Sequence, residues 1–142
     1  MATASVGLKI ENGVLLGLGT CKDKDIVIPE GVIEIHDHAF EKCKKIKSVT
    51  IPESVTLIGG FAFSKCGNLK SVTIPGSVKR IKGFAFSECG LKGVTISEGV
   101  GAINMWAFKD CKKLKSVAIP QSVKVDDHAF SRGGKPVVIP RV

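Results

Sequence analysis

A repeating unit of 22 or 23 residues predicts that this chain of 142 residues folds as a solenoid of stacked coils, mainly β. Phenylalanines that follow an alanine recur at steps of 23, 23, 22 and 22 residues, at Phe40, Phe63, Phe86, Phe108 and Phe130. Isoleucines at the end of an SVTI-type segment recur almost in step, at Ile28, Ile51, Ile74, Ile96, Ile119 and Ile139. A fixed period of this length is typical of proteins in which each repeat forms one coil and packs on the next.

The composition agrees with a thin, continuous core of aliphatic columns. The chain is 44% hydrophobic, only 6% aromatic and has no tyrosine. Its length corresponds to one domain. The first ten residues contain no apolar run typical of a signal peptide, and no stretch of 18 apolar residues predicts a membrane span. The formal net charge of +8 permits attraction to anionic polymers or surfaces.

We predict a single solenoid over residues 1–142, with a hairpin-like cap and a degenerate first repeat over residues 1–20. The dipeptide Asn12-Gly13 lies between two apolar runs, which is a strong hairpin signal. Leu18 and Cys21 then stand where Phe40 and Cys43 stand in the next unit. A terminal repeat needs such a cap because its open face has no neighbouring coil.

Residues 21–142 contain about five repeats of 22 or 23 residues, the last of them incomplete. Within a unit, the segment Ser71–Ile74 alternates polar and apolar residues, so we expect a short strand with Val72 and Ile74 pointing inward. Its equivalents would form a parallel sheet with strands about 4.8 Å apart. The Ala-Phe segment is either a second short strand or a single helical turn, and periodicity does not decide between them.

The repeated pattern I-P-x-[SG]-V-x-x-I-x-x-x-A-F-x-x-C-x-x-[LI]-x-S-V-x resembles the BspA-type leucine-rich repeat family, from about Gly13 to Pro140. This resemblance implies a right-handed, curved leucine-rich-repeat solenoid with a parallel sheet on its concave face. It also implies a surface or secreted protein with a non-catalytic role in protein interaction or adhesion. The partner would be a host matrix or cell-surface protein. The chain would be a fragment or a short member of such a surface-protein family, although it shows no anchor.

No residue is predicted to be catalytic or to bind a cofactor or a metal. Five cysteines occupy one repeat position, at Cys21, Cys43, Cys66, Cys89 and Cys111. Zinc sites usually use pairs of cysteines two to four residues apart, which this spacing lacks. We therefore expect a column of buried free thiols. His36 and His38 form a loose local cluster with Asp37, and we interpret it as exposed polar residues.

The residue just before each Ala-Phe pair is the first candidate for an interaction surface. By strand alternation, it should point away from the buried phenylalanine. An exposed strip of aromatic side chains often marks an interaction site. The predicted strip contains His38, Phe61, Phe84, Trp106 and His128.

Lysines gather just before the strand-like segments and predict one basic edge along the solenoid. This candidate edge contains Lys44, Lys45, Lys47, Lys70, Lys92, Lys112, Lys113 and Lys115. It could bind an anionic polysaccharide by releasing counterions. The absence of an arginine-rich or base-stacking arrangement argues against sequence-specific binding of nucleic acid. A further alternative is a structural repeat that associates with itself through the open ends of the stack.

Overall fold

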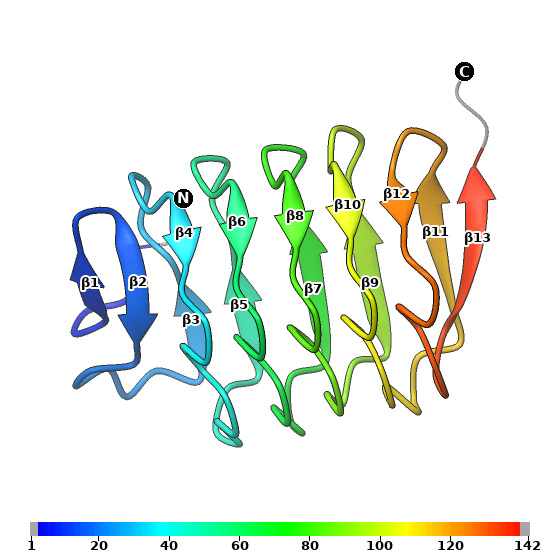
Figure 1. The fold of residues 1–142 in the computed structure, drawn as a ribbon. Helices are drawn as coiled ribbons and strands as arrows, with labels where there is room; N and C mark the ends of the chain where they lie inside the picture. Colours follow the sequence, from blue (N-terminus) through cyan, green and yellow to red (C-terminus); the bar gives the residue numbers. More distant parts are fainter. Residues whose placement is uncertain (1–2, 140–142) are drawn as a thin grey trace.

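The fold is a stack of β coils, and this computed structural model describes residues 3–139 (Figure 1). The strands are β1 (Lys9–Glu11), β2 (Val14–Gly17), β3 (Asp25–Val27), β4 (Glu34–Ile35), β5 (Ser48–Thr50), β6 (Leu57–Ile58), β7 (Ser71–Ile74), β8 (Arg80–Ile81), β9 (Gly93–Ile96), β10 (Ala102–Ile103), β11 (Ser116–Pro120), β12 (Lys124–Val125) and β13 (Lys135–Ile139). The predicted strand at Ser71–Ile74 is therefore confirmed as β7.

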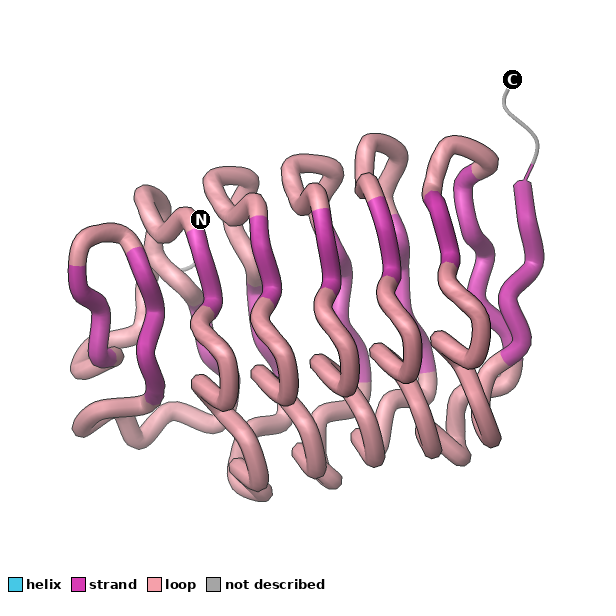
Figure 2. Tube along the Cα trace, viewed as in Figure 1, coloured by secondary structure: helices cyan, strands magenta, loops and turns pink. Residues whose placement is uncertain are grey.

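Each full coil crosses between two layers of parallel strands, as Figures 1 and 2 show. One layer contains the two-residue strands in the order β4-β6-β8-β10-β12. The other contains β3-β5-β7-β9, followed by the pair β11-β13. Equivalent residues pair in register, for example Ser48 with Ser71 and Ser71 with Gly93. The predicted stack of parallel β coils is thus confirmed, and each coil has a second short strand.

The second strand does not lie at the Ala-Phe segment, where the sequence left a strand or a helical turn open. It lies earlier in the unit, for example at Leu57–Ile58. The Ala-Phe segment itself forms successive tight turns, and no helix is present between residues 3 and 139. Accordingly, none of these residues belongs to a helix long and apolar enough to span a bilayer.

A hairpin covers the first coil. Strands β1 and β2 pair antiparallel across Asn12-Gly13, and both turn residues have positive φ, at 50° and 77°. These angles match the type of turn that fits the natural twist of a hairpin. Strand β2 then pairs in parallel with β4, so the hairpin closes one edge of the seven-stranded sheet.

The core between the two layers consists of columns of equivalent side chains. Isoleucine, valine and leucine columns fill most of it, with Ile35, Ile58 and Ile81 fully buried. The phenylalanines of the repeat form a continuous stack from Phe40 to Phe130, with ring centroids 5.0–5.2 Å apart. Because each ring is covered by the ring of the next coil, the stack buries aromatic surface throughout the five full coils.

Candidate functional site

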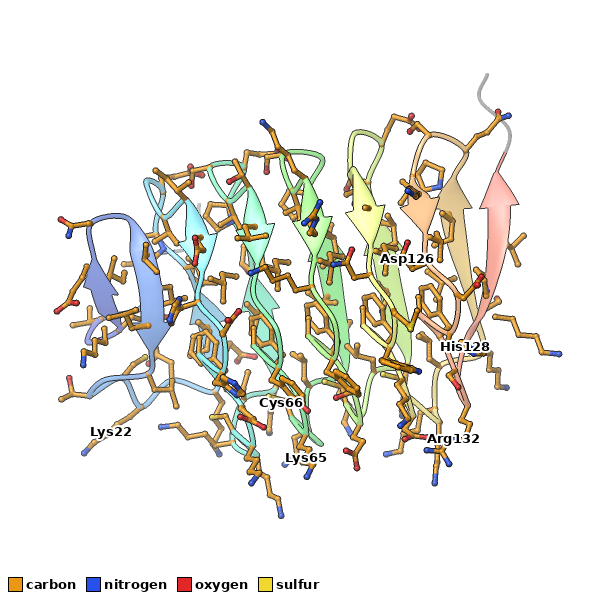
Figure 3. The ribbon with its side chains drawn as sticks, viewed as in Figure 1. Lys22, Lys65, Cys66, Asp126, His128 and Arg132 are labelled. Atoms are coloured by element: carbon orange, nitrogen blue, oxygen red, sulfur yellow. The ribbon has the colours of Figure 1, made fainter. Side chains whose placement is uncertain are left out.

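The aromatic strip lies on the turns that follow the short strands. Its five residues, His38, Phe61, Phe84, Trp106 and His128, all have a left-handed backbone, with φ between 57° and 63°. Each strip residue follows the end of a short strand by only a few positions. Figure 3 shows the last member, His128, on the face of the coils nearest the viewer. The strip therefore occupies one position in each of five successive coils.

A left-handed turn, not strand alternation, points these side chains outward. The strip residue turns the chain, the alanine after it packs inside, and the next phenylalanine enters the core. Hydrogen bonds between coils hold this conformation: the N–H of His38 donates to Gly60 O at 2.9 Å, and that of Phe40 to Ala62 O at 2.7 Å. Such a backbone costs a non-glycine residue about 1–2 kcal/mol, so the bonds between coils must offset that cost.

Four of the strip's rings stack on one another. The ring of His38 lies 5.2 Å from that of Phe61, Phe61 lies 4.8 Å from Phe84, and Phe84 lies 5.4 Å from Trp106. The first two pairs are nearly parallel, with interplanar angles of 5° and 6°, whereas Trp106 is tilted by 30°. The spacing matches that of neighbouring strands in a sheet, because each ring belongs to one coil.

Stacking determines what the strip can contact. Phe61 and Phe84 are covered by a ring on each side, so each presents an edge to solvent, and both are half-buried. The ammonium of Lys109 also lies 5.9 Å from the centre of the Phe84 ring. Trp106 remains 37% exposed. The strip therefore offers apolar edges and one large ring, which suit a packed protein contact better than a flat stacking platform.

Met105 extends this surface and was not predicted from the sequence. It is 39% exposed and immediately precedes Trp106. The equivalent positions in the other coils are Asp37, Gly60, Gly83 and Asp127. A long apolar side chain at a position otherwise held by glycine or aspartate is the signal that could have revealed it. We define Met105 and Trp106 as the apolar pair.

The lysines of the predicted basic edge are all exposed. Figure 3 shows Lys22 and Lys65, which belong to the same lysine-rich turns, along the lower border of the coils. The charge of Lys113 lowers the pKa of Lys70, with smaller effects from desolvation and from Lys92. The ammonium groups of Lys70 and Lys113 therefore repel each other although the two residues belong to coils that are not adjacent.

The cysteines form a column of free thiols, four of them buried. Three of them donate an S–H hydrogen bond to a carbonyl of the preceding coil: Cys66 to Phe40 at 3.1 Å, Cys89 to Phe63 at 2.9 Å and Cys111 to Phe86 at 3.1 Å. Burial raises the pKa of the Cys66 thiol to about 12 and that of Cys111 to about 11. Cys43 differs from the prediction because it is only half-buried.

The histidine cluster pairs with local carboxylates. His36 Nδ1 lies 3.4 Å from a carboxylate oxygen of Glu34, and His38 Nδ1 lies 2.5 Å from one of Glu41. Within residues 3–139, no three histidine, cysteine or carboxylate side chains converge in a way that could hold a metal ion. These contacts position the ring of His38 at the start of the aromatic strip.

Comparisons with known proteins identify the repeat. The model of the BspA type leucine rich repeat region matches residues 18–134 in six copies. The solved leucine rich cell surface protein of Faecalibacterium prausnitzii is 33% identical, with a TM-score of 0.78 over 87% of this chain and 35% of that protein. The leucine rich repeat protein of T. pallidum is 31% identical, with a TM-score of 0.77 over 83% of this chain and 58% of that protein.

A third solved structure, a leucine-rich repeat protein from Bacteroides ovatus, is 33% identical, with a TM-score of 0.59 over 82% of this chain and 37% of that protein. This chain thus spans between about a third and three fifths of the length of the solved proteins that it resembles. No curated protein matches it.

Proposed function

This chain belongs to the BspA-type leucine-rich repeat family, and we propose that it is a non-catalytic scaffold that binds another protein through the aromatic strip. The partner would be a matrix protein or a cell-surface protein. The solved F. prausnitzii protein is named a leucine rich cell surface protein, which supports a location of this scaffold at a cell surface.

The exposure of the apolar pair carries this proposal, because the pair lies at the end of a stack of rings that is already formed before any partner binds. Met105 and Trp106 are among the few large hydrophobic side chains that remain exposed among the described residues. Tryptophan and methionine are enriched at the centres of protein interfaces. The stack below Trp106 holds its ring in place, so binding would cost little side-chain entropy.

The test replaces both members of the apolar pair, Met105→Ser with Trp106→Ser, and measures binding to immobilised fibronectin, laminin and collagen. A partner that buries this pair should bind at least about tenfold more weakly, because truncating a central aromatic residue usually costs 2 kcal/mol or more. The matched control is Val6→Ser with Ile33→Ser, which removes two apolar side chains that are 84% and 54% exposed but lie outside the strip.

Binding of the partner can also be followed by fluorescence in the unmodified protein. Trp106 is the only tryptophan and the chain has no tyrosine, so emission reports on the strip directly. We expect a bound matrix protein to shift the emission to shorter wavelength and to protect it from iodide. Equal binding by the folded double variant, or an equal loss in the control, would overturn the proposal.

Self-association is the second candidate, and the unpaired sheet edges favour it. Among the described residues, β12 pairs only with β10, and β13 pairs only with β11. A hollow of about 460 Å³ lies at this end, lined among others by Val125, Phe130 and Pro136. Light scattering that rises with protein concentration, and that the apolar-pair variant leaves unchanged, would support this candidate.

A further inference from the structure

A lysine stands directly before each of the strands β3, β5, β7, β9 and β11, and the lysines of successive coils lie side by side. The N–H of Lys47 donates to Lys24 O at 2.7 Å, that of Lys70 to Lys47 O at 3.2 Å, and that of Lys92 to Lys70 O at 2.8 Å. Lys115 holds the equivalent position before β11. We define these five residues as the lysine ladder. Bonded coils place its steps about 4.8 Å apart.

Near β11, two more lysines and part of the ladder line a hollow. Lys112 and Lys113 line a hollow of about 540 Å³ together with Lys92, Lys115 and Ser116. Lys70, the ladder residue of the preceding coil, senses the same charge, since Lys113 is the largest influence lowering the pKa of its ammonium. This concentration of positive charge is unfavourable by itself, because like charges repel at short range.

Carboxylates do not neutralise this hollow. Within residues 3–139, none of the lysines of the hollow or of the ladder forms an ion pair. Glu88 and Asp110 line a neighbouring hollow with Lys112 and Arg132. The carboxylate of Asp110 is bound by the guanidinium of Arg132, with Nε 2.8 Å from one oxygen and Nη2 3.0 Å from the other. The excess charge of the lysines is thus available to an external anion.

We propose that the lysine ladder binds a linear anionic polysaccharide that lies along the solenoid axis, with the lysine hollow as its tightest point. A polymer in this direction would meet one ammonium in each coil. Because the ammonium groups sit on flexible stems, they can follow sulfates or carboxylates whose spacing differs from that of the coils.

Hydroxyl groups beside the ladder favour a sugar polymer over a nucleic acid. The longer strands present Ser71, Thr73, Thr95 and Ser116 to solvent, and Ser116 also lines the hollow. Hydroxyls donate and accept hydrogen bonds, as sugar hydroxyls require. Binding of single-stranded nucleic acid relies on stacking of bases on aromatic rings. No aromatic side chain lines the lysine hollow.

This inference is independent of the aromatic strip, since no strip residue lines the hollow or belongs to the ladder. The two proposals can therefore fail separately. The apolar-pair variant, Met105→Ser with Trp106→Ser, keeps all the lysines and should retain full affinity for the polysaccharide. If that variant lost affinity for both the protein partner and the polysaccharide, the ladder would not be a separate surface.

The experiment measures binding of a short heparin oligosaccharide by calorimetry, using the whole chain. The test variant carries Lys70→Gln, Lys92→Gln and Lys113→Gln, which remove two charges that line the hollow and the ladder charge of the preceding coil. The control carries Lys9→Gln, Lys79→Gln and Lys124→Gln, three exposed lysines of β1, of the turn before β8 and of β12. Both variants have the same net charge, so they separate a local site from general attraction.

We expect the test variant to bind about tenfold more weakly or worse, since three ion pairs are lost, and the control to stay within about twofold of the unmodified protein. Affinity should also fall linearly with the logarithm of salt concentration, more steeply in the unmodified protein than in the test variant. Thermal unfolding should show that the test variant is folded, because removing neighbouring positive charges relieves repulsion.

Three results would overturn the proposal. Equal losses in both variants would indicate attraction by net charge alone. No loss in either variant would place the binding site elsewhere. Tighter binding of a single-stranded thymidine oligonucleotide than of heparin, with the same sensitivity to the test variant, would assign the ladder to nucleic acid instead. Dextran, which carries no charge, should not bind in any case.

Discussion

Single residues with a left-handed backbone shape every full coil. Besides the strip residue, a second residue four positions later also has positive φ: Lys42, Lys65, Glu88, Asp110 and Arg132. Between the two, alanine and phenylalanine enter the core. Asparagine and glycine tolerate this conformation best, yet in these coils phenylalanine, tryptophan and lysine adopt it. Backbone hydrogen bonds between neighbouring coils, such as Lys65 N–H to Ser87 O at 2.8 Å, support it.

The thiol column should make stability depend on alkaline pH. The folded chain keeps Cys66 protonated up to about pH 12 and Cys111 up to about pH 11, against an ordinary thiol value of 9.0. Stability is therefore complete below about pH 9 and is lost as pH rises toward the folded pKa values. Each thiol should contribute about 1.4 kcal/mol per pH unit in this range. Urea unfolding between about pH 8 and pH 11 measures the effect.

A single substitution separates the thiol effect from that of the other charged groups. Cys66→Ala removes one buried thiol and leaves every lysine in place. Its free energy of unfolding should fall less steeply with pH than that of the unmodified protein. Identical slopes for the two proteins would show that the buried thiols do not determine the alkaline limit of stability.

At the scale of the coil, length differences are confined to the turns, so the core columns stay in register. The third full unit is one residue shorter than the second, between its cysteine and its leucine. Even so, Leu91 occupies the same buried column as Leu69. Gly90 makes this possible, because its backbone approaches Gly67 of the previous coil so closely that a Cβ there would lie 2.1 Å from the Gly67 carbonyl oxygen.

Gly90→Ala should therefore destabilise the protein by about 1–3 kcal/mol or more, as overpacking does. The contact is with backbone, which cannot turn away as a side chain can. The matched control is Gly67→Ala, since no atom lies within 4 Å of a Cβ at that position. Urea unfolding followed by Trp106 fluorescence compares the two. A loss as small for Gly90→Ala as for Gly67→Ala would show that the turn relaxes freely.

At the scale of the whole molecule, stacking places equal charges side by side. The net charge of +8 is unevenly distributed, because the lysine-rich turns of successive coils gather along one border of the stack. Equivalent residues of successive coils lie side by side, so the apolar residues pack on one another in every coil and the lysines repel one another in every coil. The same register that builds the core therefore concentrates lysines at the ladder.

Salt should stabilise the folded chain. Raising NaCl from about 0.01 M to about 0.5 M shortens the Debye length from about 30 Å to a few ångströms and screens the repulsion among lysines. We expect the melting temperature to rise by a few degrees, and calorimetry or circular dichroism measures it. The variant with Lys70→Gln, Lys92→Gln and Lys113→Gln should show a smaller rise, and an unchanged rise would locate the repulsion elsewhere.

The sequence by itself determined the period, the columns of the core and the hairpin at Asn12-Gly13, and it assigned the strip residues to one shared repeat position. It could do so because a stacked coil repeats its inward positions at a fixed spacing. Only the tertiary structure decided the second strand of each coil, the ring stacking, the exposure of Met105 and the repulsion between Lys70 and Lys113. These features depend on hydrogen bonds and charges between coils. A left-handed turn at Phe84 or Trp106 has no local sequence signal, because the neighbouring coil, not the residue itself, stabilises it.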